Sequence, residues 1–302
     1  MRKGGGLDVT PTRGAAEDGW LDIRVPGPVR RHPVRAAMVL VPLALVGAIA
    51  YSLSSYWLRA QPGAKSVSAA VQELRGSAGH GVAGGGAFRY PPPSPGVYSL
   101  AGSGAERISF PPNSQRDGSV MPATVTTLGH GCWRWRLDYN VAHWEEYDFC
   151  ASGTQLVQAA NRNGQRWDFG SFSVSNTARF TCPAGTDVLP ADVSVGQEVR
   201  WTCTGENSAV PGATEARTTV QMLGTQDLRI AGTSVRAVHE RQDTVLSGSQ
   251  RGTVVMEWWF SASTGLPLRV SRTITISTAS PVGDITYTES GSWRMTSLDP
   301  RR

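Results

Sequence analysis

The stretch at residues 129–150 holds most of the side-chain types that could do chemistry. Its sequence, GHGCWRWRLDYNVAHWEEYDFC, contains two histidines, two cysteines, four acidic residues and three tryptophans. Histidine, cysteine and carboxylate side chains are the usual ligands of zinc, and a pair of carboxylates can act as general acid and base. The same residue types could also build a structural hairpin, and their spacing helps to distinguish the two.

The spacing of these residues favours a β-hairpin. In one antiparallel register of residues 132–139 with 143–150, five complementary pairs face each other: Cys132 with Cys150, Arg134 with Asp148, Arg136 with Glu146, Trp133 with Phe149, and Trp135 with Tyr147. Such cross-strand pairs contribute about 0.2–1 kcal/mol each, and a shift by one residue would lose them on both faces. The adjacent Glu145 and Glu146 point to opposite faces of a strand, so they cannot form one catalytic pair. We therefore interpret the stretch as a structural hairpin rather than a metal or catalytic site.

All four cysteines, at positions 132, 150, 182 and 203, lie beyond a candidate membrane anchor. An even number of cysteines in an exported domain is typical of disulfides. The hairpin pairs Cys132 with Cys150 and leaves Cys182 for Cys203, although four cysteines allow three pairings. No C-x-x-C motif is present, so a zinc ribbon or a thioredoxin-type redox site has no support. We predict no metal site and no cofactor.

The candidate anchor is the uncharged segment at residues 36–57, AAMVLVPLALVGAIAYSLSSYW. As a helix it is long enough to cross a bilayer. Arg30, Arg31 and Arg35 precede it and few basic residues follow, so the positive-inside rule places the N-terminus in the cytoplasm. We predict a single-pass plasma-membrane protein with its C-terminal domain outside the cytoplasm. A signal peptide cleaved near residues 48–50 is the alternative.

The composition divides the rest of the chain. Residues 1–35 are rich in Gly, Pro and Arg without apolar periodicity, which predicts a disordered cytoplasmic tail. Residues 58–95 are interpreted as an extracytoplasmic linker, in which 66–76 could form a short helix with Val67, Val71 and Leu74 on one side. Of the formal charge of +5, about +3 falls in the tail, which leaves the remainder too weakly basic for a nucleic-acid surface.

Residues 96–302 alternate between extended segments and turns. The segments, of roughly 6–12 residues, are rich in Val, Thr, Ile and aromatic residues, as strands are. The sequences AGSG, NRNG, STG and SPVGD are interpreted as turns between them. No convincing helix appears in this part of the sequence. We predict one all-β domain formed by a strongly curved antiparallel sheet, a barrel or half-barrel, with a sandwich as the alternative.

Alternation in the C-terminal strands identifies candidate binding residues. In VVMEWWF, Trp258 and Trp259 lie on opposite faces, so either both faces are covered or one lines a cavity. Arg272 and Glu289 each interrupt an apolar strand face. Because a buried carboxylate is costly unless it is paired, we expect Glu289 to pair with Arg272 or His239. The candidate ligand-binding residues are Glu289, Arg272, His239, Trp258, Trp259 and Glu257.

Several motifs resemble known protein families. The sequences PGVYSLAGSGAERISF, GCWRWRL, RFTCPAG, VRWTC and SGSQRGTVVMEWWFSASTGLPLRVSR are similar to a family of uncharacterised actinobacterial single-pass membrane proteins with a β-rich extracytoplasmic domain. More remotely, the WWF…TGLPLR turn resembles hairpins of periplasmic lipoprotein-carrier folds. That resemblance implies a bent sheet around an apolar cavity, but carrier folds usually add helices under the sheet, and this chain shows none after residue 96.

These features indicate two classes of function. The first is a non-catalytic binding or scaffolding domain of the cell envelope, which holds a lipid-like ligand or a protein partner; with a fully packed core it would be a protein-interaction module. The second is an envelope hydrolase with Glu289, Glu257 and His239 in its site. Because no G-x-S-x-G elbow or P-loop occurs, we favour binding without catalysis. A continuous apolar cavity would support the binder, and converging carboxylates in an open cleft would support the hydrolase.

Overall fold

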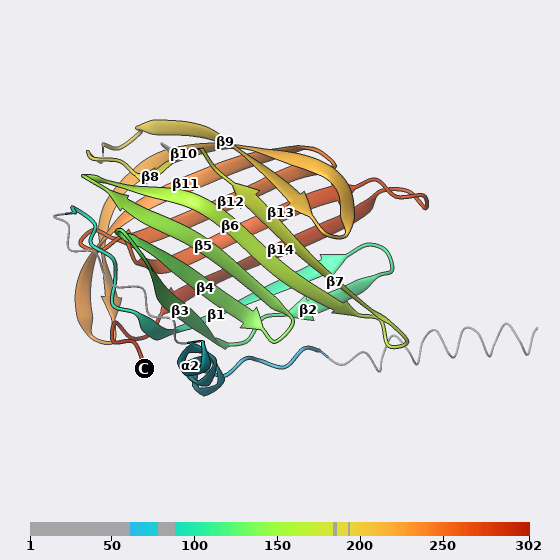
Figure 1. Ribbon diagram of the computed structural model, residues 1–302, viewed down its shortest axis with the longest axis horizontal. Helices are drawn as coiled ribbons and strands as arrows, with labels where there is room; N and C mark the ends of the chain where they lie inside the picture. The colour runs from blue at the N-terminus through green and yellow to red at the C-terminus, as the bar shows by residue number, and fades with distance from the viewer. Residues whose placement is uncertain (1–60, 78–87, 184–185, 193) are drawn as a thin grey trace, which may run out of the picture. The chain divides into compact units, whose positions relative to one another are not determined.

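The computed structural model describes residues 61–77, 88–183, 186–192 and 194–302 (Figure 1). The described residues contain one helix, α2 (Val67–Gly76), and are otherwise built from β-strands. The strands are β1 (Gly96–Ile108), β2 (Asn113–Arg116), β3 (Val120–Gly129), β4 (Cys132–Asn140), β5 (His143–Ser152), β6 (Gln155–Asp168), β7 (Ser173–Thr181), β8 (Asp187–Leu189), β9 (Glu198–Asn207), β10 (Val210–Ile230), β11 (Thr233–Gly248), β12 (Gln250–Ser261), β13 (Pro267–Thr278) and β14 (Ile285–Met295).

Twelve of these strands close into an antiparallel barrel. Their order is β14-β13-β12-β11-β10-β9-β7-β6-β5-β4-β3-β1, and β1 pairs again with β14. Strand β1 pairs with β3 over residues 96–101, with β14 over residues 100–108 and with β2 over residues 105–108. Closure leaves no free edge on the main sheet. The all-β prediction is therefore confirmed as a closed barrel, rather than a half-barrel or a sandwich.

The predicted hairpin forms in the expected register. Cys132 lies opposite Cys150, and the two charged and two aromatic pairs follow as the sequence pattern requires. On the outer face, Arg134 Nε lies 2.7 Å from Asp148 Oδ1, and Arg136 Nη1 lies 2.9 Å from Glu146 Oε1. Arg162 from β6 joins the same network. The charges thus occupy one face of the hairpin and the aromatic rings the other.

The aromatic face of the hairpin belongs to the core. Trp133, Trp135 and Phe149 are each less than 2% exposed, and Trp258 and Phe260 from β12 meet them across the barrel. The rings of Trp135 and Trp258 pack edge-to-face with their centroids 5.7 Å apart, a favourable aromatic geometry. One end of the interior, where β1 begins, is therefore tightly filled.

Two of the predicted turns are wrong. AGSG at residues 101–104 lies inside β1, and NRNG at 161–164 lies inside β6. Their glycines make room for tryptophans on neighbouring strands, since a Cβ on Gly102 would lie 2.7 Å from Trp293 Cδ1 and one on Gly164 would lie 2.4 Å from Trp144 Cε2. Glycine inside a strand often marks such a close approach. The STG and SPVGD turns are confirmed, between β12 and β13 and between β13 and β14.

Both predicted disulfides are present, Cys132–Cys150 and Cys182–Cys203. The first links β4 to β5, and the second links β9 to Cys182, which directly follows β7; the described residues include no free cysteine. Disulfides of this kind persist in oxidising compartments. The pairing therefore agrees with a domain that lies outside the cytoplasm.

Removing the second disulfide is expected to cost about 3 kcal/mol of unfolding free energy, because the bridge closes a loop of about 20 residues. The variant is Cys182→Ala/Cys203→Ala, compared with the wild type by urea unfolding under non-reducing conditions. Cys132→Ala/Cys150→Ala opens a loop of similar length and should lose a similar amount. If the Cys182→Ala/Cys203→Ala variant unfolded at the wild-type urea concentration, the bridge would have no stabilising role.

Helix α2 packs against the outside of the barrel. Its Ala70 and Val71 are buried together with Val97 of β1, with Val67 and Leu74 beside them, so the predicted apolar side of the helix is confirmed. The segment 58–95, predicted as a linker, therefore contains a part that belongs to the barrel domain.

The predicted tail at residues 1–35 and the predicted anchor at residues 36–57 lie outside the described residues. Within the part of the chain that is described, no helix is both long and apolar enough to span a bilayer.

Candidate functional site

The other end of the barrel encloses a cavity of about 630 Å³. Its lining includes Phe110 of the β1–β2 connection, Pro211 next to the β9–β10 turn and Pro281 of the β13–β14 turn. The strand registers place all three connections at the end of the barrel where β1 finishes. The cavity therefore extends from the middle of the barrel to this rim.

The walls of the cavity differ in character. Strands β12 and β13 contribute the aliphatic side chains of Val254, Ile274 and Ile276, and Phe180 and Trp201 add aromatic surface from β7 and β9. On the opposite side, successive inward positions of β6 carry amides, namely Asn161, Asn163 and Gln165. A cavity with one apolar wall and one wall of neutral hydrogen-bonding groups suits an amphipathic molecule.

A buried ion-pair cluster forms the inner end of the cavity. The Arg272 side chain is 2% exposed; its Nε donates to Glu289 Oε1 at 2.6 Å, and its Nη1 donates to Glu145. Its guanidinium also lies over the Tyr139 ring, 4.2 Å from the centroid. Burial alone would lower the pKa of Arg272, but Glu289, Tyr139 and Glu145 together hold the pKa well above its usual range. The predicted pairing of Glu289 with Arg272 is confirmed.

Glu145 is the second carboxylate of this cluster. It accepts hydrogen bonds from Tyr139 at 3.0 Å, from Tyr147 at 2.8 Å and from Asn161 at 3.3 Å. Burial alone would raise the pKa of Glu145, but Arg272 and the hydrogen bond from Tyr147 together lower the pKa. The Glu145 carboxylate is therefore occupied by one ion pair with Arg272 and by hydrogen bonds from three neutral donors.

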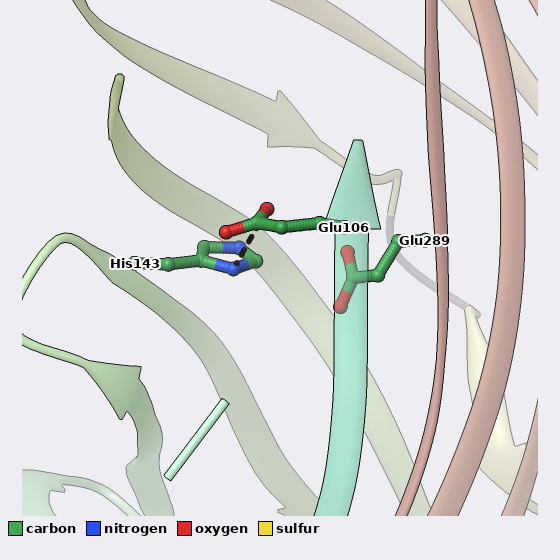
Figure 2. Close-up of side chains that lie close together, drawn as sticks. All are labelled: Glu106, His143 and Glu289. Carbon is green, nitrogen blue, oxygen red and sulfur yellow. Dashed lines mark ion pairs between the residues drawn. The ribbon is translucent and has the colours of Figure 1, made fainter. Parts of the chain in front are cut away.

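A third carboxylate, Glu106, lies directly opposite Glu289 in the β1–β14 pairing (Figure 2). His143 from β5 points at both, with its Nδ1 at 3.3 Å from Glu106 Oε2. The Tyr287 hydroxyl donates to Glu106 at 2.9 Å, and it also contacts Glu289. Burial alone would lower the pKa of His143, but the Glu106 and Glu289 carboxylates together raise the pKa to about 9.

These three side chains could hold a metal ion. One ligand atom from each of Glu106, His143 and Glu289 lies within 4.8 Å of the others, and all three residues are buried. Asp117 is a further carboxylate that interacts electrostatically with the cluster; burial, followed by Glu289, raises its pKa to about 7. Neither Asp117 oxygen has a hydrogen-bond partner among the described residues.

The remaining predicted site residues do not join this cluster. His239 and Glu257 pair with each other at 3.2 Å on the outer face of the barrel, and Trp259 stacks on His239 with centroids 4.1 Å apart. Trp258 points inward but belongs to the filled end. Glu257 alternates with the inward-facing Met256 and Trp258, so the predicted hydrolase site of Glu289, Glu257 and His239 does not assemble.

Sequence reasoning missed Glu106 and His143. Glu106 interrupts a small and apolar face of β1 in the way that Glu289 interrupts β14, so the same alternation test would have found it. His143 shares the inward face of β5 with Glu145 and Tyr147, whereas the sequence pattern alone places it in the hairpin loop or at the end of an arm. In both cases, the alternation of side chains between the two faces of a strand indicates that the residue points inward.

Comparisons with known proteins add little to this site. No protein-family model matches the chain, and neither does any curated protein. A crystal structure of the hypothetical lipoprotein YmcC from Escherichia coli (K12) is similar at 12% sequence identity and a TM-score of 0.33, over 75% of this chain and 96% of that chain. Values this low carry no functional inference, and the similarity to actinobacterial membrane proteins stays a prediction. The volume and lining of the cavity are therefore the best guide to the function.

Proposed function

We propose that the barrel is a binding domain of the cell envelope that holds an amphipathic, lipid-like molecule in its cavity and catalyses no reaction on it. The observation that carries the proposal is the cavity of about 630 Å³ with one apolar and one amide-bearing wall. Pockets for small molecules usually measure about 300–1,000 Å³ and combine apolar surface with a few polar groups.

The hydrogen bonds of Glu145 and Glu289 disfavour these two carboxylates as a general acid or base. Arg272 pairs with both Glu145 and Glu289, and tyrosine hydroxyls contact the same carboxylates. A general acid or base needs an oxygen that is free to exchange a proton with a substrate. A cavity that reaches the rim also argues against a fully packed interaction module. The two disulfides support a location outside the cytoplasm.

Filling the cavity is expected to abolish ligand binding. Ala216 of β10 lines the cavity and is 8% exposed, so Ala216→Trp places an indole in the space that the ligand would occupy. Because the sequence predicts a membrane anchor, the full chain is reconstituted in nanodiscs and titrated with dansyl-undecanoic acid, a fluorescent fatty-acid analogue. We expect the probe affinity to fall at least tenfold.

The matched control is Ala105→Trp on the outside of β1, where Ala105 is exposed. This variant carries the same added indole and should bind the probe as the wild type does, after subtraction of the empty-nanodisc signal. Thermal unfolding shows whether both variants fold. Equal probe affinities for the two variants, or no binding by the wild type above the empty nanodiscs, would contradict the proposal.

A further inference from the structure

We propose that Glu106, His143 and Glu289 form a binding site for one divalent cation of the zinc type. This inference goes beyond the proposed ligand, because a cation could bind here whether or not the cavity is filled. The three ligands come from β1, β5 and β14, and their side chains lie close together inside the barrel (Figure 2).

The spacing of the Glu106 and His143 ligand atoms fits a small metal ion, and the Glu289 side chain would move closer to complete the site. His143 Nδ1 and Glu106 Oε2 are 3.3 Å apart, and all three ligand atoms lie within 4.8 Å of one another. Two ligands of a tetrahedral zinc, each about 2.0–2.1 Å from the metal, are separated by about 3.3 Å. One imidazole and two carboxylates form a familiar type of three-ligand zinc set, which leaves a coordination position open.

Unsatisfied buried atoms mark the same place. Glu106 is 2% exposed, yet its Oε1 has no hydrogen-bond partner among the described residues. His143 Nδ1 is also buried, and its approach to Glu106 lacks hydrogen-bond geometry. Buried polar atoms in proteins nearly always have a partner, and a bound ion can serve as that partner where no protein group does. A cation held by His143 Nδ1 and by both oxygens of the Glu106 carboxylate would satisfy both unpartnered atoms.

The charge balance of the cluster favours a dication. Among the residues joined by ion pairs, Glu106, Glu145 and Glu289 supply three negative charges and Arg272 supplies one positive charge. With neutral His143 the sum is about −2, and protonation of His143 reduces it only to about −1. A divalent cation bound to neutral His143 brings the sum to zero, and uncompensated charge is costly in a buried site.

Neighbouring groups hold the carboxylates in place. Tyr287 and Gln165 donate to Glu106, while Arg272 donates to Glu289. Tyr139 packs against the His143 ring with centroids 4.7 Å apart. Hydrogen bonds from outside the ligand set orient metal ligands and tune their affinity.

The test uses the full chain in nanodiscs, stripped with EDTA and titrated with zinc chloride. Calorimetry and elemental analysis after dialysis should give one zinc per chain for the wild type. His143→Gln should reduce the zinc affinity at least tenfold, and Glu106→Gln should do the same. The matched control is His239→Gln, which removes the histidine of the outer-face pair with Glu257 and should leave the stoichiometry and affinity unchanged.

An interior variant could fail to fold, so the effect of zinc on the unfolding temperature is also measured on two proteins whose interior is unchanged. Zinc should raise the unfolding temperature of the wild type and of His239→Gln alike. Absence of zinc binding by the wild type would overturn the proposal and leave His143 and Glu106 as a plain ion pair. Loss of the zinc effect in His239→Gln would also overturn it. Probe binding to the EDTA-treated chain tests the ligand proposal separately, since that proposal requires no metal.

Discussion

Replacing Arg272 by methionine is expected to lower the free energy of unfolding by about 3–5 kcal/mol, the largest loss we predict from a single charged side chain. Arg272 is the cation that compensates both Glu289 and Glu145 inside the barrel. Methionine keeps most of the volume but leaves the two carboxylates without a counter-charge. A buried charge that loses its partner must either stay unpaired or take up a proton, and both are costly.

The measurement is urea unfolding of the full chain near neutral pH, with a surface ion pair as control. Arg241 pairs with Asp243 on the outside of β11, where both side chains are more than a third exposed, so Arg241→Met should cost less than about 1 kcal/mol. Adding Glu145→Gln and Glu289→Gln to Arg272→Met should recover part of the loss, because no charge is then left unpaired. Similar losses for Arg272→Met and Arg241→Met would contradict the buried cluster.

Replacing Glu240 by glutamine is expected to stabilise the protein, and increasingly so as the pH rises. Glu240 is 0% exposed, and its Oε1 accepts a hydrogen bond from Gln242 Nε2 at 2.7 Å. No cation pairs with it among the described residues, and its neighbours across the sheet are Met222 and Trp258. Burial raises the pKa of Glu240 well above its usual range, although Gln242 opposes the shift. We therefore expect the Glu240 side chain to be a neutral acid in the folded protein.

The direction of this pH dependence follows from the protons that the folded and unfolded states bind. The unfolded chain releases the Glu240 proton at a pKa of about 4.3, while the folded protein keeps it. Wild-type stability therefore falls as the pH rises above that value, by up to about a factor of ten in the unfolding equilibrium constant per pH unit, until the folded-state pKa is reached. Glutamine has no proton to lose and can keep the hydrogen bond from Gln242.

The check is urea unfolding of wild type and Glu240→Gln between pH 5 and 9. The gap between them should widen with pH, whereas Glu198→Gln, at an exposed ion pair with Arg200, should track the wild type. A pH-independent gap would mean that Glu240 is ionised in the folded protein.

The hairpin was predictable because its information is local. Cysteine, charged and aromatic pairs all agreed on one register between adjacent strands, and the period of two made any other register unfavourable. The two wrong turns failed for a reason that is not local. Gly102 and Gly164 leave space for tryptophans on neighbouring strands. The sequence of one segment alone does not show which strand will be its neighbour.

The charged cluster was predictable only in part. Arg272 and Glu289 lie on consecutive strands, so one hairpin is enough to bring them together. Glu106 meets Glu289 only because β1 closes the barrel against β14, and His143 reaches them across the interior. For His239 and Glu257, residue type indicated a site, whereas strand parity places both side chains outside.

The proposal that the barrel holds a ligand is tested most directly by identifying the small molecules that copurify with the protein. Because the sequence motifs resemble those of actinobacterial membrane proteins, the full chain is expressed in an actinobacterial host and purified in nanodiscs of synthetic lipid. Its bound small molecules are extracted and quantified by mass spectrometry beside the Ala216→Trp and Ala105→Trp variants. We predict that one amphipathic molecule, absent from the synthetic lipid, accompanies the wild type and Ala105→Trp in near-stoichiometric amount and is lost from Ala216→Trp. Equal amounts in all three proteins, or none in the wild type, would contradict a ligand-holding barrel.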